Sequence, residues 1–419
     1  MASAREIAMK AIYEVEFDKA YSNMILKKYL AGTELSKQDK AFITSIVYGV
    51  IDKKITLDYV IGCFSKLKLK KISKYILIIL RMGIYQIMYM DKIPVSAAVN
   101  ESVKLAKRYG HGASAGFVNG ILRNVLKTDF KYPENKTEYL SIMYSYPMWL
   151  CEKWEKEFGY DFTKELFEAF SETPKLNLRP NTLKISAEEL LDKLQNNGIE
   201  AERQDDYIVS GGFDIASDRL YKSGYYTIQD AAAMQAAKIL APEEGDIVID
   251  MCAAPGGKTT HMAEIMRDKG KIYAFDVYEH KIELIRKNAE RLGISIIETR
   301  LSDSSIFDEQ YRETADKILC DVPCSGLGIL RRKREIKWNR DENTNFPEIQ
   351  CKILDNAAKY LKSGGEMVYS TCTIEKEENS AVTGAFAADN SEFKIMYEKT
   401  FYPHIDHTDG FYICKLKKD

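Results

Sequence analysis

Two cysteines in the C-terminal half of the chain stand directly after runs that predict β-strands. Asp321-Val322-Pro323-Cys324 follows Lys317–Cys320, and Ser370-Thr371-Cys372 follows Glu366–Tyr369. The carboxyl ends of neighbouring parallel strands lie at one edge of a sheet, so we expect both thiols to face a single site. A lone cysteine in this position is more often a small buried apolar residue. A pair favours chemistry in which a thiolate adds to an electron-poor carbon.

A loop that contains two glycines follows an earlier apolar run, Ile247–Met251. Its residues are Cys252, Ala253, Ala254, Pro255, Gly256, Gly257 and Lys258. The glycines allow the backbone to approach a ligand, and the N–H groups of the helix that starts there favour an anionic group. Asp276 ends the next run, where its carboxylate can accept hydrogen bonds from both hydroxyls of a ribose. Together they predict a site for S-adenosylmethionine, and no metal is expected.

Other motifs that could explain the same residues do not match. Gly257-Lys258-Thr259 resembles the end of a phosphate-binding P-loop, but Cys252 stands where that motif needs a glycine. The G-x-G-x-x-G pattern of nicotinamide enzymes is absent from the loop. Asp321-Val322-Pro323-Cys324 replaces Asp-Pro-Pro-Tyr, which is typical of enzymes that methylate exocyclic amines. The pattern therefore favours methyl transfer to carbon.

A thiol pair beside a methyl donor indicates methylation of carbon 5 of a cytosine. This carbon is too weak a nucleophile to attack a sulfonium methyl group directly, whereas addition of a thiolate to carbon 6 creates an enamine that can attack. A base then removes the proton from carbon 5, and the thiol is eliminated. Asp321 is expected to hold the base at its ring nitrogen and exocyclic amine. The spacing does not reveal whether Cys324 or Cys372 attacks.

The other cysteines are not expected to react. Cys320 lies inside an apolar run and is predicted to be core, and Cys252 is expected to shape the cofactor loop. No role is assigned to the remaining four, Cys63, Cys151, Cys351 and Cys414. Eight cysteines without a C-x-x-C pair indicate neither a zinc site nor a dense disulfide framework, so the thiols are expected to be reduced.

Targeting and membrane signals are not expected in this chain. The first residues, MASAREIAMK, lack the apolar core of a signal peptide. The most apolar run, Tyr75–Met90, contains Arg81 and is shorter than the ~20 residues that a membrane-spanning helix needs. We therefore expect a buried helix here and a cytoplasmic protein.

With 419 residues, the chain is too long for one hydrophobic core, and its patterns predict three domains. Residues 1–128 show amphipathic helical patterns with short connections, which predict an all-α bundle. Residues 129–230 mix helical and strand patterns and are expected to form a small α+β linking module. Residues 231–419 alternate between strand and helix patterns, which predicts a doubly wound, mainly parallel α/β sheet of the Rossmann-like type.

Several motifs resemble the RNA cytosine-5 methyltransferases of the NOL1/NOP2/Sun type. Over residues 230–419 these are CAAPGGK, DVPCSG, RRKREIKW, YSTCTI with EKEENS after it, and DGFYICKL. Residues 93–125 are similar to the second half of a NusB domain, a helical RNA-binding module. YPMWLCEKWEKEFG and LNLRPNTLK resemble the module that joins such a domain to the catalytic one. The combination is similar to the bacterial members of the family that act on 16S ribosomal RNA.

The resemblance implies a role for each matching residue. Cys372 of the Thr-Cys element would be the nucleophile, and Cys324 of the Pro-Cys element would assist release of the product. Residues 252–258 would bind the methyl donor, with Asp276 at its ribose, Asp303 near its adenine and Asp321 as the acidic residue of its motif. DNA cytosine-5 methyltransferases attack with the Pro-Cys thiol instead, so the division of roles depends on the family alone.

Two basic clusters stand out although the net charge is only −2. The first is predicted to be a solvated face and comprises Lys66, Lys68, Lys70, Lys71 and Lys74. The second follows the Pro-Cys element and, with Trp338, is expected to meet RNA phosphates and a base. It comprises Arg331, Arg332, Lys333, Arg334, Lys337 and Arg340.

The function expected from the sequence is methylation of one cytosine in 16S ribosomal RNA or in a small-subunit assembly intermediate. The helical domain would help to dock the RNA. The protein is expected to be a monomer without an obligate protein partner. Two alternatives remain open at this point: cytosine-5 methylation of transfer RNA or 23S ribosomal RNA, and a non-catalytic NusB-like RNA-binding assembly factor.

Overall fold

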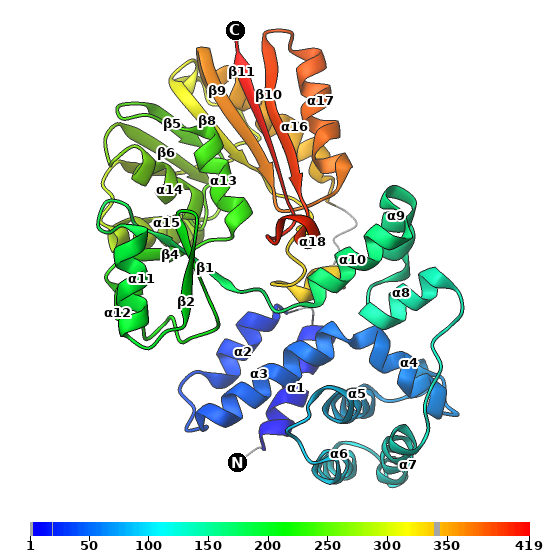
Figure 1. Cartoon of the computed structure of the whole chain (residues 1–419). Helices are drawn as coiled ribbons and strands as arrows, with labels where there is room; N and C mark the ends of the chain where they lie inside the picture. The colour runs from blue at the N-terminus through cyan, green and yellow to red at the C-terminus, as the bar shows by residue number, and fades with distance from the viewer. Residues whose placement is uncertain (1–2, 19, 339–343) are drawn as a thin grey trace. The chain divides into compact units, whose positions relative to one another are not determined.

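The computed structural model describes residues 3–18, 20–338 and 344–419 (Figure 1). They form two compact units. The first comprises residues 1–171 together with 333–340, and the second comprises residues 172–332 together with 341–419. The short segment 333–340 therefore belongs to the first unit although both of its flanks belong to the second.

The first unit is helical throughout its described residues, as expected for the N-terminal bundle. Serines cap two of its helices: Ser3 accepts a hydrogen bond from Glu6 N and Ser36 one from Asp39 N. The segment 333–340 adds the 3-10 turn η3 (Arg334–Lys337), and η1 (Leu69–Lys71) lies between two helices. The α-helices are α1 Ala4–Phe17, α2 Ser22–Leu30, α3 Lys37–Asp52, α4 Lys54–Phe64, α5 Lys74–Tyr89, α6 Val95–Tyr109, α7 Ser114–Lys127, α8 Lys136–Tyr144, α9 Met148–Phe158 and α10 Tyr160–Ser171.

Helix α5 is the buried centre of this unit, as its apolar sequence predicts. Ile78, Ile79 and Leu80 are fully buried within one hydrophobic core. Arg81 interrupts the apolar run and is also buried, because its guanidinium binds Glu16 and Asp58 at 2.6 Å each. A buried cation is tolerated only with such partners. No helix within the described residues is long and apolar enough to cross a membrane.

The second unit begins with a small antiparallel sheet in the order β2-β3-β1-β4. Its helix α11 (Ala187–Asn196) starts with a capping box, in which Ser186 and Glu189 each accept a hydrogen bond from the other's backbone N–H. A shorter helix, α12 (Arg219–Lys222), precedes the last strand. The strands are β1 Leu176–Pro180, β2 Ala201–Gln204, β3 Tyr207–Ser210 and β4 Tyr226–Ile228. The small α+β module expected from the sequence is thus confirmed.

The remainder of this unit is a seven-stranded sheet in the order β10-β11-β9-β8-β5-β6-β7. The pairs from β9 to β7 are parallel, whereas β11 is antiparallel to both of its neighbours. The expected Rossmann-like α/β domain is confirmed, and the antiparallel edge is an addition to it. The strands are β5 Ile247–Asp250, β6 Lys271–Asp276, β7 Ile297–Leu301, β8 Ala315–Asp321, β9 Leu361–Thr371, β10 Phe393–Phe401 and β11 Phe411–Lys418.

Helices cover both faces of this sheet because side chains alternate along each strand. On β8, Ile318 and Cys320 belong to the core that includes residues of α16 (Phe346–Tyr360), while Leu319 belongs to the core that includes residues of α13 (Ala231–Leu240). Cys320 is fully buried, which confirms its predicted place in the core. The other elements around this sheet are α14 Gly257–Ile265, α15 Glu279–Leu292, α17 Ser380–Asp389, α18 Pro403–Asp406, and the 3-10 turns η2 Glu309–Tyr311 and η4 Lys376–Glu378.

A buried ion pair joins the small sheet of the second unit to helix α14. Arg179, on β1, binds Glu264 of α14 at 2.8 Å, and both side chains are at most 4% exposed. The same guanidinium donates to the carbonyl oxygen of Gly257 at 2.7 Å and to Thr260. Arg179 thereby fixes the start of the helix that follows the glycine loop.

We expect Arg179→Met to lower the free energy of unfolding of this unit by roughly 3–5 kcal/mol, because Glu264 would remain buried without its cation. Urea denaturation measures the change. The control is the double variant Arg179→Met/Glu264→Leu, which should recover most of the loss. A loss below about 1 kcal/mol in the single variant would show that water reaches Glu264.

Candidate active site

The two cysteines that the sequence singled out lie side by side. Cys372 directly follows β9 and Cys324 lies three residues beyond β8, on two strands that pair in parallel with Asp321 opposite Ser370. Their Sγ atoms are 3.1 Å apart. Both side chains are half-buried, and neither cysteine is in a disulfide. One substrate atom could therefore be reached by both sulfurs.

Backbone contacts hold the loops that carry the thiols. Gly328 N donates to the carbonyl oxygen of Cys372 at 3.0 Å, and Gly410 N donates to the carbonyl oxygen of Gly328 at 2.8 Å. A Cβ atom at Gly328 would collide with the Gly410 carbonyl, so this approach requires glycine. Ser325 Oγ also donates to Thr373 Oγ1 at 2.9 Å. The two loops thus form one rigid frame.

Asp321 and Lys258 form an ion pair at the same edge of the sheet. Lys258 Nζ lies 2.6 Å from Asp321 Oδ2, and Asp321 Oδ1 accepts a hydrogen bond from Ser370 Oγ at 2.8 Å. The pKa of Lys258 lies above its ordinary value. Burial lowers this pKa, but the charge of Asp321 and, to a smaller extent, that of Cys372 raise it by more. The ammonium group therefore interacts favourably with a thiolate at Cys372.

Burial and neighbouring groups also act on the Cys324 thiol. Its hydrogen bond with Cys372, then burial, and then the charges of Cys372 and Glu378 raise the pKa of the Cys324 thiol well above its ordinary value. A negative carboxylate acts on this sulfur, whereas a positive ammonium acts on the other.

The glycine loop lies between β5 and α14 as expected. Gly256 has φ +100°, and a Cβ atom there would lie 3.3 Å from Ile285 Cα, whereas a Cβ atom at Gly257 would meet nothing within 4 Å. The backbone at Gly257 is therefore open to a ligand. Burial raises the pKa of Cys252 well above normal, so this thiol stays protonated.

Asp250, the last residue of β5, is a site residue that the sequence reasoning missed. Its Oδ2 accepts a hydrogen bond from Thr259 Oγ1 at 2.7 Å, while its buried Oδ1 has no partner among the described residues. Burial raises the pKa of Asp250 to about 7. An unsatisfied buried acceptor beside an open glycine loop suits the cationic amino group of S-adenosylmethionine. The signal in the sequence was an acidic residue closing the apolar run just before the loop.

Asp276 is the last residue of β6, and Asp303 lies just beyond the adjacent strand β7, at the same edge. Asp276 is 7% exposed, and its Oδ1 accepts a hydrogen bond from Tyr278 N at 3.2 Å. Asp303 is exposed, and its Oδ1 accepts from Ser305 N and Oγ at 2.9 and 2.7 Å. The two carboxylates thus stand at successive strand ends beyond the loop, which is where the ribose and adenine of a nucleotide bind in open α/β sheets.

Carboxylates within the protein bind most residues of the second basic cluster, and its contact with RNA stays a prediction. Arg331 binds Asp409 at 2.5 Å, and Arg332 binds Asp409 and Asp230. In the first unit, Arg334 and Lys337 both lie 3.0 Å from Asp52. Lys333 is exposed, and Arg340 lies outside the described residues.

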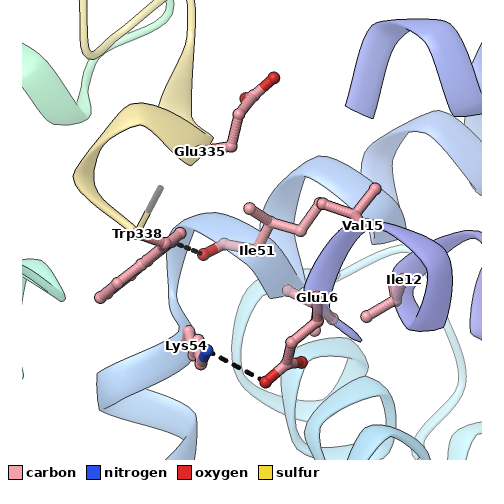
Figure 2. Close-up of a pocket in the computed structure, with 8 residues that line it drawn as sticks. Ile12, Val15, Glu16, Ile51, Lys54, Glu335 and Trp338 are labelled. Carbon is pink, nitrogen blue, oxygen red and sulfur yellow. Dashed lines mark hydrogen bonds and ion pairs between the residues drawn. The ribbon is translucent and has the colours of Figure 1, made fainter. Parts of the chain in front are cut away.

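Trp338 is also occupied within the first unit. Its Nε1 donates to the carbonyl oxygen of Ile51 at 2.8 Å, and its ring borders a cavity of about 130 Å³ (Figure 2). The cavity is lined by Ile12, Val15, Glu16, Val50, Ile51, Lys54, Glu335 and Trp338. None of the residues predicted to bind the cofactor or react lines it. The indole is therefore a structural anchor of the segment 333–338.

The sheet order and the glycine loop define the fold of an S-adenosylmethionine-dependent methyltransferase. The family model for the 16S rRNA methyltransferase RsmB/F matches residues 237–417, that of the NusB family matches residues 2–127, and that of an RsmF/B-like ferredoxin-like domain matches residues 146–210. The chain belongs to the RsmB/F methyltransferase family. Among the described residues, no group of three or more His, Cys, Asp or Glu side chains is arranged to hold a metal ion.

Relatives are similar over essentially the full chain. A probable ribosomal RNA small subunit methyltransferase B of Bacillus subtilis is 37% identical, with 99% of each chain covered. One of Synechocystis is 33% identical, with 100% of each covered. The crystal structure of PH0851 is 28% identical with a TM-score of 0.81, covering 98% of this chain and 97% of that one. The helical bundle, the small module and the methyltransferase domain are thus found together in these relatives.

Asp250→Asn is expected to stabilise the protein at pH 8 by up to about 4 kcal/mol. Folding raises this carboxyl's pKa to about 7, so its contribution to stability is complete below pH ~4 and is lost as the pH rises through about 7. Urea unfolding at pH 5 and pH 8 measures the difference from wild type, which should shrink at pH 5. Equal stability of both proteins at pH 8 would contradict the desolvation of Asp250.

Proposed function

We propose that the protein methylates carbon 5 of one cytosine in 16S ribosomal RNA through a covalent adduct with Cys372. The observation that carries the proposal is the 3.1 Å separation of Cys324 Sγ and Cys372 Sγ at the edge of the sheet where the glycine loop lies. Methylation of an amine or a hydroxyl needs no thiol, whereas methylation of this carbon needs a nucleophile at carbon 6. Membership in the RsmB/F family supports the choice of RNA.

The residues of the glycine loop would hold the cofactor, which supplies an electrophilic methyl group when it is bound. Asp250 would bind its cationic end, Asp276 its ribose hydroxyls and Asp303 its adenine. Residues 252–258 would line the rest through backbone groups. The loop that would hold the cofactor and the two sulfurs beyond β8 and β9 lie at the same edge of the sheet.

In the proposed reaction, the Cys372 thiolate forms a bond to carbon 6 of the base while the Lys258 ammonium offsets the negative charge before attack. Asp321 accepts a hydrogen bond from the exocyclic amine and so holds the base, while the Lys258 ammonium beside Asp321 offsets the negative charge that develops on the ring. After methyl transfer, a base removes the proton from carbon 5. The bond between Cys372 Sγ and carbon 6 then breaks, and Cys324 assists this release.

Cys372→Ala should abolish transfer of labelled methyl groups to RNA, whereas Cys324→Ala should accumulate a protein–RNA adduct that survives denaturation. The reason is that only the first variant lacks the attacking sulfur, while the second lacks the group that assists elimination. Gel electrophoresis in denaturant with labelled cofactor measures both. Cys351→Ala is the matched control, since Cys351 is half-buried and lies outside this site. An active Cys372→Ala protein would refute the assignment.

The substrate is tested in cells by bisulfite mapping of total RNA from a strain that lacks the gene. Loss of one protected cytosine in 16S ribosomal RNA is the expected result. Loss in transfer RNA or 23S ribosomal RNA would move the same chemistry to another substrate. An unchanged map, together with no binding of S-adenosylmethionine in calorimetry, would instead support a non-catalytic assembly factor.

The first lysine cluster is our candidate for docking RNA phosphates. Lys66, Lys68, Lys70 and Lys71 are exposed around η1, and no ion pair involves them within the described part of the chain. Lys74 differs, because its ammonium lies 4.3 Å from the ring centroid of Phe17. Unpaired cations can replace the counterions of RNA, whereas cations already bound to carboxylates cannot do so as readily.

Lys66→Glu/Lys68→Glu/Lys70→Glu is therefore expected to weaken RNA binding at least tenfold and to lower the salt dependence of binding by about 0.7–0.9 for each phosphate that the variant no longer neutralises. Filter binding between 50 and 200 mM salt measures both quantities. The control reverses three exposed lysines of the second unit, Lys193, Lys352 and Lys394. Equal weakening by both triple variants would show a general charge effect rather than a docking surface.

A further inference from the structure

The segment that follows Cys372 contacts both cysteine loops through two consecutive residues. Glu378 ends η4, and Asn379 follows it before α17 begins. Their side chains are 6% and 2% exposed. They belong to the EKEENS motif, to which the proposed reaction assigns no task.

Asn379 holds the loop of Cys372. Its Oδ1 accepts a hydrogen bond from Thr371 Oγ1 at 2.6 Å, and its Nδ2 donates to the carbonyl oxygen of Thr373 at 3.0 Å. These partners are the residues directly before and after Cys372. Both are fully buried, so a missing bond would leave a polar group without water.

Glu378 holds the loop of Cys324. Its Oε2 accepts hydrogen bonds from Ser325 N at 2.9 Å and from Gln350 Nε2 at 3.1 Å. Gln350 Nε2 also donates to the carbonyl oxygen of Pro323 at 2.9 Å, so the residues on both sides of Cys324 are fixed. The Glu378 carbonyl accepts from Tyr369 Oη at 2.6 Å, which ties the turn to β9.

Glu378 also brings a negative charge to one of the two sulfurs. Among the described residues, Cys372 after β9, Tyr369 on β9 and the carboxylate of Glu378 on η4 interact electrostatically with Cys324. The Lys258 ammonium, a cation at this edge of the sheet, interacts electrostatically with Cys372. Glu378 therefore brings a negative charge next to the residue that precedes Ser325 in the chain, Cys324.

We propose that Glu378 is a positioning residue that holds the Cys324 loop and, through its charge, keeps Cys324 a neutral thiol, so that the ionised sulfur of the pair is Cys372. The inference rests on the proposed function, in which Cys372 attacks. It goes further by naming what makes the two thiols different. A neutral Cys324 carries a proton throughout the attack and does not compete as a nucleophile.

The test compares Cys372→Ala with Cys372→Ala/Glu378→Gln. In both proteins Cys324 is the one sulfur of the pair that can be alkylated. Glutamine retains an oxygen that can accept from Ser325 N and removes only the charge. Alkylation of Cys324 by iodoacetamide is followed by mass spectrometry from pH 7 to 10. We expect the rate at pH 8 to rise roughly three- to tenfold in the double variant, which corresponds to a fall of about half to one unit in pKa. An unchanged rate in a protein that melts normally would overturn the inference.

A second measurement keeps the test decisive if the glutamine variant does not fold. In Cys372→Ala alone, the pH midpoint of Cys324 alkylation should lie above the ~8.5 of a free thiol, and a midpoint at or below that value would overturn the inference. Neither measurement needs RNA or cofactor. Absence of methyl transfer to any RNA would therefore refute the proposed function while the alkylation result still decides the role of Glu378.

Discussion

The parallel pairing of β8 with β9 is the constraint on which the site depends. Neighbouring strands lie about 4.8 Å apart, and their register sets Asp321 opposite Ser370. Residues just beyond those positions are thereby brought within reach of each other, and two sulfurs end 3.1 Å apart although 48 residues separate them in the chain. Any slip of this register would separate the thiols and also break the hydrogen bond from Ser370 to Asp321.

Buried charge is balanced locally at each place where the architecture needs a polar group. Arg179 and Glu264 join the small sheet to α14, Arg81 sits between two carboxylates within the helical bundle, and Asp52 receives two cations of the segment 333–338. Asp250 is the exception within the described residues of the cofactor loop, since one of its oxygens has no partner. A buried oxygen without a partner destabilises the folded protein. Such a group is expected at a site where a ligand brings the missing charge.

Much of this arrangement was readable in the sequence because it depends on local pattern. Strand ends followed by Cys324 and Cys372, and the glycine loop after Ile247–Met251, follow from the alternation of strands and helices. The antiparallel β10–β11 edge was not predicted, because strands that pair over long distances carry no local signal of direction. The contacts of Glu378 and Asn379 were equally invisible, since they depend on how a turn packs against two other loops.

The positive charge of the second basic cluster said less about its role than the carboxylates that bind its residues in the fold. Lys337 and Arg334 look like a phosphate-binding run in the sequence, yet Asp52 lies far upstream and only the fold brings it to them. Burial lowers the pKa of Lys337 to about 8, which no pattern of neighbouring residues could indicate. By contrast, the lysines of the first cluster, around η1, are exposed.

The segment 333–338 has a consequence for how the protein is made. Its residues complete the helical unit through Asp52 and Ile51, but they are translated only after residues 172–332 of the other unit. The N-terminal bundle emerges first from the ribosome with an anchor site for Trp338 still empty. The two units therefore cannot mature one after the other during synthesis, and the bundle reaches its final packing only after β8 and the loop that carries Cys324 have been made.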